Sequence, residues 1–155
     1  MKIKIEAFLA VAAVACAAVA LPAKDTPYPS EKLAAFVVDK LDVTSLPAPY
    51  RPKKQKGKKT LTDYGYTVQK LRETEALVEA AGSTNELSIK ILQDGPTGIY
   101  ACMAEGIADG HDPKAQSVIL LKRKGPTDLL KGRETWREFK SCPVIGESDS
   151  NFQSY

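Results

Sequence analysis

Two cysteines forty residues apart constrain the fold of this chain more than any other feature. Cys102 and Cys142 lie in the C-terminal half, and the third cysteine, Cys16, lies in an apolar stretch near the start. If the chain is exported and that stretch is removed, an even pair remains, and an even pair in a secreted chain is most simply one disulfide. In the chain-entropy model such a loop stabilises the fold by about 3–4 kcal/mol. The alternative is a pair of free, buried thiols.

The first residues have the three regions of a secretory signal peptide. Lys2 and Lys4 form a basic region, and an unbroken run of 15 apolar residues follows at 7–21. The run is short for a membrane span, which needs about 17–25 residues. Small residues before the expected cleavage point, after Ala20 or a little later, suit signal peptidase. We therefore expect a signal peptide at 1–20 and a secreted, extracellular protein; an uncleaved anchor and a lipoprotein modified at Cys16 are the alternatives.

Residues 21–59 are expected to form an arm that is Pro-rich, basic and largely disordered. Five prolines lie in this arm after residue 24, and they favour extended backbone. One short helix is plausible at 31–41, where Ser30 can cap it. Its apolar residues fall on one face and suggest that the helix docks on something: Leu33, Phe36, Val37 and Leu41.

The arm ends in a basic tract at 51–59 that contains no acidic residue. Its six cations are Arg51, Lys53, Lys54, Lys56, Lys58 and Lys59. A solvated linker is the default for such a run. Three functions compete with it: a dibasic processing site, an electrostatic tether to an anionic cell wall, membrane or nucleic acid, and a nuclear-localisation signal that would require uptake into a host cell.

From residue 60 to 146 the pattern indicates a single globular domain. Apolar residues at helical spacing predict a helix within 62–82, with Gly82 as its end. Alternation at 87–91, a turn at 94–98 and an extended segment at 99–107 predict a hairpin. The apolar run at 117–122 predicts a third strand, covered on both faces.

The segment 127–141 is ambiguous between a helix and strands. We favour a short strand around Leu130, a turn at Lys131 and Gly132, and a strand from 134 to 142, because a glycine inside a helix costs about 1 kcal/mol. A flexible tail is expected at 147–155. The fold class is therefore α+β, with one or two N-terminal helices followed by a small antiparallel β-sheet or β-sandwich closed by one disulfide.

The order of the C-terminal segments resembles the small secreted β-sandwich effectors of plant-pathogenic fungi, the MAX class. The shared features are Cys102 in a strand, an apolar strand that ends in basic residues and glycine at 117–125, two short segments, and Cys142 followed by Pro-Val-Ile. The similarity covers about residues 98–146. It implies a compact six-stranded sandwich, a role in virulence, and binding to host proteins through strand edges and loops without catalysis. No contact motif is shared, so no binding residue is carried over.

A small secreted hydrolase or nuclease is the rival interpretation. His111 is the only histidine, which rules out sites built from two histidines of one chain, and its neighbours indicate a polar loop. A glycosidase needs two facing carboxyl groups, and Glu105, Glu134 and Glu138 are the candidates. Trp136 and Phe139 are interpreted as core. No catalytic residue, metal or cofactor is assigned; we expect an unknown protein partner, with an anionic surface or nucleic acid as a further partner of the basic tract.

Overall fold

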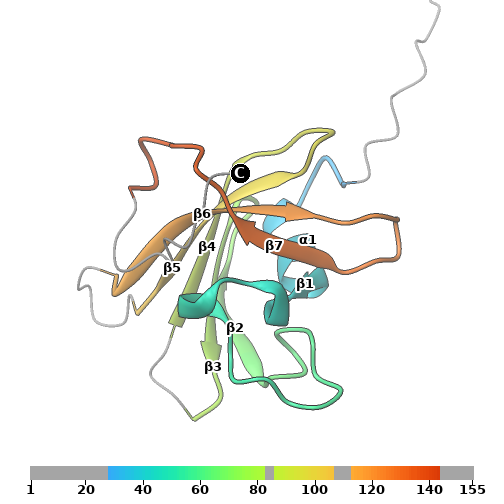
Figure 1. Cartoon of the computed structure of the whole chain (residues 1–155), viewed down its shortest axis with the longest axis vertical. Helices are drawn as coiled ribbons and strands as arrows, with labels where there is room; N and C mark the ends of the chain where they lie inside the picture. Colours follow the sequence, from blue (N-terminus) through green and yellow to red (C-terminus); the bar gives the residue numbers. More distant parts are fainter. Residues whose placement is uncertain (1–27, 83–85, 107–112, 144–155) are drawn as a thin grey trace, which may run out of the picture.

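The computed structural model describes residues 28–82, 86–106 and 113–143 (Figure 1). The predicted signal peptide at 1–20 and the predicted tail at 147–155 lie outside these ranges. Within them, none of the helices has the length and hydropathy needed to cross a bilayer.

A curled, mixed β-sheet of seven strands makes up most of the described chain (Figure 1). Its strand order is β1-β7-β6-β5-β4-β3-β2. All neighbours are antiparallel except β1 and β7, which run parallel, so the prediction of an antiparallel sheet is wrong at this edge. The strands are β1 Leu41–Asp42, β2 Tyr66–Leu71, β3 Glu75–Ala80, β4 Glu86–Gln93, β5 Ile99–Glu105, β6 Ala115–Lys122 and β7 Leu130–Glu134.

The centre of the sheet follows the predicted pattern. Leu87, Ile89 and Ile91 of β4 are buried, while Lys90 between them is exposed. β5 continues after the predicted turn and pairs with β4. The predicted third strand is β6, which lies between β5 and β7 with its middle fully buried. A run that is apolar on both faces therefore occupies a central position, as expected.

The predicted helix within 62–82 is wrong, because this segment forms the hairpin of β2 and β3. Ala76 and Val78 of β3 face the core, and they pair with Ile89 and Leu87 of β4. An apolar residue at every second position of β3 also satisfies strand periodicity. Pairing with β4 therefore decides the conformation of residues 75–80, and it outweighs the helical spacing of the apolar residues in this segment.

The predicted disordered arm is wrong for residues 28–50, which are part of the core. The predicted short helix is present as α1, Leu33–Lys40, and is the single α-helix of the described residues. Two 3-10 turns follow β1: η1, Val43–Ser45, and η2, Ala48–Tyr50. Eight apolar side chains of this segment are buried in the main core: Tyr28, Leu33, Ala34, Val37, Leu41, Val43, Leu46 and Tyr50. The prolines shape the connections between these elements rather than preventing them from folding.

Segment 127–141 contains one strand, β7, and no helix. The strand prediction is confirmed at Leu130, but the predicted turn at Lys131 and Gly132 is wrong because both lie inside β7. A Cβ atom on Gly132 would lie 2.5 Å from Leu46 Cδ2 and 3.0 Å from Ile119 Cγ2. Glycine is therefore needed here for the close approach of η1 to the sheet. The predicted strand from 134 to 142 is reduced to a single bridge between Phe139 and Cys142.

The two faces of the sheet carry separate apolar clusters. The inner face holds the main core, covered by α1, η1 and η2. The outer face holds a small cluster of Cys102, Val118 and Cys142, with Tyr100 and Phe139 packed against it.

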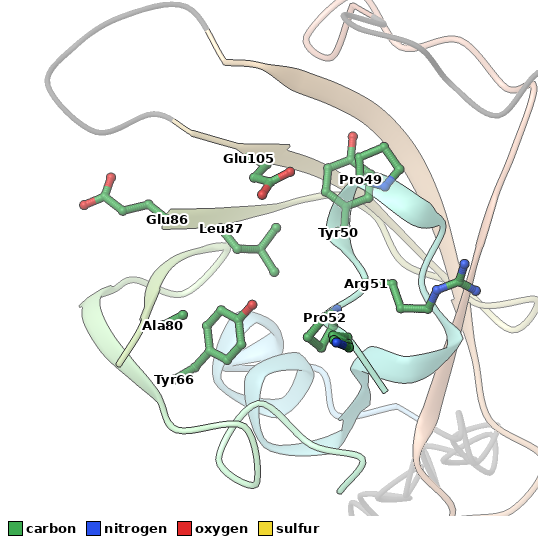
Figure 2. A pocket seen from close by; sticks show the side chains of 10 residues that line it. Pro49, Tyr50, Arg51, Pro52, Tyr66, Ala80, Glu86, Leu87 and Glu105 are labelled. Carbon is green, nitrogen blue, oxygen red and sulfur yellow. The ribbon is translucent and has the colours of Figure 1, made fainter. Parts of the chain in front are cut away.

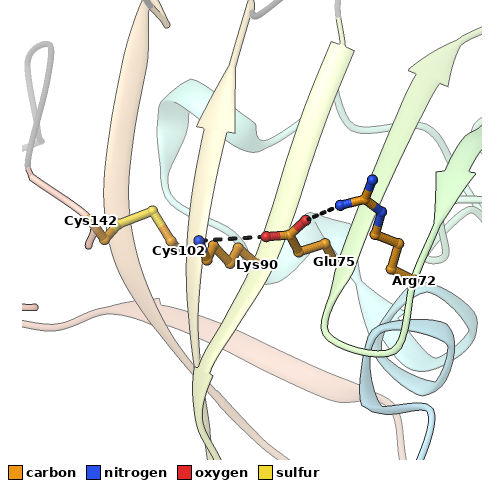
Figure 3. A network of polar contacts seen from close by, with 5 residues as sticks. All are labelled: Arg72, Glu75, Lys90, Cys102 and Cys142. Atoms are coloured by element: carbon orange, nitrogen blue, oxygen red, sulfur yellow. Dashed lines mark ion pairs between the residues drawn. A yellow bond between two sulfur atoms is a disulfide. The ribbon is translucent and has the colours of Figure 1, made fainter.

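The predicted disulfide is confirmed: Cys102 and Cys142 are bonded, with their Cα atoms 5.6 Å apart (Figure 3). The bond holds the C-terminal segment on the outer face of β5. Trp136 in the same segment is 86% exposed, so its assignment to the core is wrong.

Candidate functional site

The basic tract at 51–59 is exposed, as predicted, but it is anchored to the domain. The backbone amide of Gln55 donates a hydrogen bond to the Tyr64 hydroxyl at 3.1 Å, and the Lys58 ammonium lies 5.7 Å from the centre of the Tyr64 ring. At its end, the Lys59 carbonyl accepts a hydrogen bond from the Val43 amide at 2.8 Å. The tract therefore follows a fixed path across the surface.

The start of the tract lines a hollow of about 300 Å³, which we call the Glu105 hollow (Figure 2). β4 and β5 supply its acidic residues, and η2 with the tract supplies its other wall. Figure 2 shows that the Glu86 carboxylate is directed away from the centre of the hollow. The Glu105 carboxylate is directed toward Tyr50. The lining residues are Pro49, Tyr50, Arg51, Pro52, Lys53, Tyr66, Ala80, Glu86, Leu87 and Glu105.

Burial shifts the acid-base properties of three groups in this hollow. Partial burial raises the pKa of Glu105, against the opposing effect of the Lys114 ammonium. Burial raises the pKa of Tyr50 to about 12, although a hydrogen bond with the Ser117 hydroxyl at 3.0 Å acts in the other direction. Burial and the charge of Glu105 raise the pKa of Tyr66. The hollow therefore favours the neutral forms of its acids.

We expect Glu105→Gln to make the protein more stable than the wild type at neutral pH, with no difference at pH 3. A raised pKa in the folded state means that wild-type stability is lost as pH rises through that pKa. Glutamine imitates the protonated form and removes this loss. Thermal unfolding followed by circular dichroism between pH 3 and 7 measures the effect. Glu86→Gln is the matched control, and an equal pH-dependent gain in both variants would contradict the role of burial.

The candidates for a hydrolytic site are only partly brought together. Glu105, whose pKa is raised, and Arg51 line the same hollow, but Figure 2 shows the Arg51 guanidinium directed away from the Glu105 carboxylate. Glu134 lines another hollow, with Arg133, Thr135 and Trp136. His111 lies outside the described residues. In the part of the chain that the structure describes, no group of three or more potential metal ligands is present.

The open edge of β2 is a feature that the sequence did not indicate. β2 is the last strand of the sheet, and almost all of its residues are exposed. Val68 and Leu71 pair with Val78 and Ala76, whose side chains face the core. Residues directly opposite in an antiparallel pair share a face, so Val68 and Leu71 also point to the inner face. They are nevertheless 47% and 48% exposed.

Comparisons with known proteins found no match: no protein-family model, no curated protein and no solved structure matches the chain.

Proposed function

We propose that this is a small secreted, effector-like protein that binds a host or extracellular protein without catalysis, and that it does so by pairing an extended segment of its partner with β2. The observation that carries the proposal is the inner face of the sheet, which continues as apolar surface beyond its covered part. Val68 and Leu71 occupy core-facing positions on an edge strand, and each remains about half exposed. An added strand would supply the missing backbone partners and cover both side chains.

Two lysines near the ends of β2 favour a partner with acidic residues on both sides of its apolar positions. Lys70 is exposed on the strand itself, and no acidic residue occurs in β2. At the other end, Lys58 lies over Tyr64, two residues before β2 begins. Cations at both ends would steer an acidic segment into register and disfavour a basic one.

The resemblance to MAX-class effectors supports the same mode of binding, because it implies binding to host proteins through strand edges and loops. It also supports a fungal source and a host partner. The disulfide supports export, because such bonds persist in oxidising compartments.

Selection of displayed peptides on the immobilised protein tests this function. We expect enrichment of extended sequences with alternating apolar residues and acidic flanks. Val68→Thr with Leu71→Thr should weaken the binding of an enriched peptide by about tenfold or more, because it removes both apolar contacts. Fluorescence polarisation with the labelled peptide measures the change.

The matched control is Thr67→Val, which makes the reverse change on the outer face of the same strand. It should leave affinity within about twofold. Peptides that bind the double variant as tightly as the wild type would contradict the proposal. A wild-type protein that sediments as a dimer, with the double variant monomeric, would replace the foreign partner with a second copy of the chain.

The hydrolase or nuclease interpretation is the second candidate, and the Glu105 hollow is the observation that favours it. Glu105 would act as the acid or base and Arg51 would bind the anionic group. We rank it second because the Glu86 carboxylate and the Arg51 guanidinium both point away from the centre of the hollow (Figure 2). Cleavage of RNA or a glycan that is lost in Glu105→Gln would reverse the ranking.

A further inference from the structure

A second basic surface forms where the end of the tract meets the turn between β6 and β7. We call it the lysine hollow, and its volume is about 710 Å³. The sheet register explains why these residues lie side by side. Asp42 of β1 lies opposite Lys131 of β7, and Lys131 lies opposite Lys122 of β6. The hydrogen bond from Val43 to the Lys59 carbonyl brings the end of the tract to the same place. The lining residues are Asp42, Lys59, Lys122, Arg123, Lys124, Thr127, Asp128, Leu129 and Lys131.

Positive charge in the lysine hollow exceeds negative charge by three. Its five cations face two carboxylates, and both carboxylates already accept local hydrogen bonds. Asp42 accepts one from the Thr44 amide at 3.1 Å, and Asp128 accepts one from the Gly125 amide at 2.9 Å. Within the described ranges, no ion pair involves the four lysines. Together they create a positive potential that attracts an anion to the hollow.

The shape and lining of the hollow indicate what kind of anion fits. Sites for single-stranded nucleic acid present aromatic rings to the bases. The lysine hollow presents none, and the nearby rings of Tyr28 and Phe36 are covered by the Arg123 guanidinium, 5.8 Å and 4.8 Å from their centres. Lysine ammonium groups bind phosphate as point charges. A concave site with converging lysines thus suits several phosphate groups held close together.

We propose that the lysine hollow binds a compact ligand carrying several phosphate groups, either a free polyphosphate or a polyphosphorylated lipid headgroup. This site is separate from the edge of β2, so the proposal stands or falls independently of the proposed function. The basic tract then has a defined role, because its last residue completes the hollow.

Titration calorimetry with inorganic tripolyphosphate tests the proposal on the intact secreted protein. Lys122→Gln with Lys124→Gln should weaken binding by about tenfold, because two charged contacts are lost. Both lysines are exposed, so the variant keeps the fold, which circular dichroism checks. The matched control is Lys53→Gln with Lys54→Gln, which removes the same charge from the tract outside this hollow. It should change affinity by less than about threefold.

A second arm distinguishes the source of the phosphates. Phosphatidylcholine vesicles with and without phosphatidylinositol bisphosphate are sedimented with the protein. Binding that depends on the bisphosphate and on Lys122 and Lys124 assigns the hollow to a headgroup, and tripolyphosphate binding alone assigns it to a free ligand. Equal losses in both double variants, binding of duplex nucleic acid without tripolyphosphate binding, or no binding to either probe would overturn the proposal.

Discussion

Leu46→Ala is expected to lower the free energy of unfolding by about 3 kcal/mol, within the range of about 2–5 kcal/mol for such a change in a packed core. Leu46 is completely buried and contacts the inner face of the sheet beside Gly132. Its loss removes apolar contacts and leaves a cavity that the neighbouring strands cannot close. Urea unfolding followed by circular dichroism measures the difference.

The matched control is Leu71→Ala, the same substitution at the half-exposed edge of β2. It should cost less than about 1 kcal/mol, because less apolar area is removed from contact. A second control uses the crowding at Gly132. Gly132→Ala alone should destabilise by about 1–3 kcal/mol through overpacking, and less when combined with Leu46→Ala, which makes room for the added methyl group. Equal, small effects of Leu46→Ala and Leu71→Ala would mean that residues 28–50 are an arm after all.

Cys102→Ala with Cys142→Ala is expected to lower the free energy of unfolding by about 4 kcal/mol. The disulfide closes a loop of forty residues, and the chain-entropy model gives about this value for such a loop. The bond also fixes the C-terminal segment on the outer face, where a small apolar cluster and a hydrogen bond from the Gln116 side chain to the Pro143 carbonyl at 2.8 Å also hold it. Without the bond, Phe139 is expected to leave the ring of Tyr100, 5.7 Å away.

Reduction supplies the control for this variant. Wild-type protein with dithiothreitol should lose about the same stability as the double alanine variant, and the reductant should not affect the variant itself. The polar contacts on the same face cannot compensate, because Glu75 pairs with Arg72 and Lys90 at 3.7 and 3.5 Å through partly exposed side chains (Figure 3). A loss below about 1 kcal/mol would show that the disulfide does not hold the fold together.

The central strands could be predicted because their signals are local, and the disulfide because two cysteines remain once the stretch with Cys16 is removed. Leu87, Ile89 and Ile91 alternate with polar residues, a turn follows, and the run at 117–122 is apolar on both faces. The helix at 33–40 was predicted from one apolar stripe. These patterns are the same whatever the rest of the chain does.

The remaining elements depend on partners that are distant in the sequence. Ala76 and Val78 fit a helix or a strand until β4 is placed beside them. Gly132 predicts a turn by its residue type alone, but its role is to admit Leu46, which lies 86 residues earlier in the sequence. The prolines of residues 28–50 suggested disorder, while the side chains between them complete the inner core.

The candidate sites likewise depend partly on local composition and partly on the strand order. The basic tract was visible as composition, but its convergence with Lys122 and Lys131 needs the register of β1, β7 and β6. The edge of β2 cannot be recognised from the sequence, because the spacing of apolar residues in 62–82 predicts a helix. An edge is a property of the strand order, and no short pattern in the sequence records it.

Hydrogen–deuterium exchange of the β2 amides, with and without an enriched acidic peptide, tests the central claim most directly. In the free protein, we expect the outward-facing amides of Tyr66–Leu71 to exchange quickly, because no strand covers this edge. With saturating peptide they should become protected, while the amides of β6 in the centre of the sheet remain unchanged. Protection that appears elsewhere with β2 still exchanging quickly would contradict the claim that this edge is the binding surface.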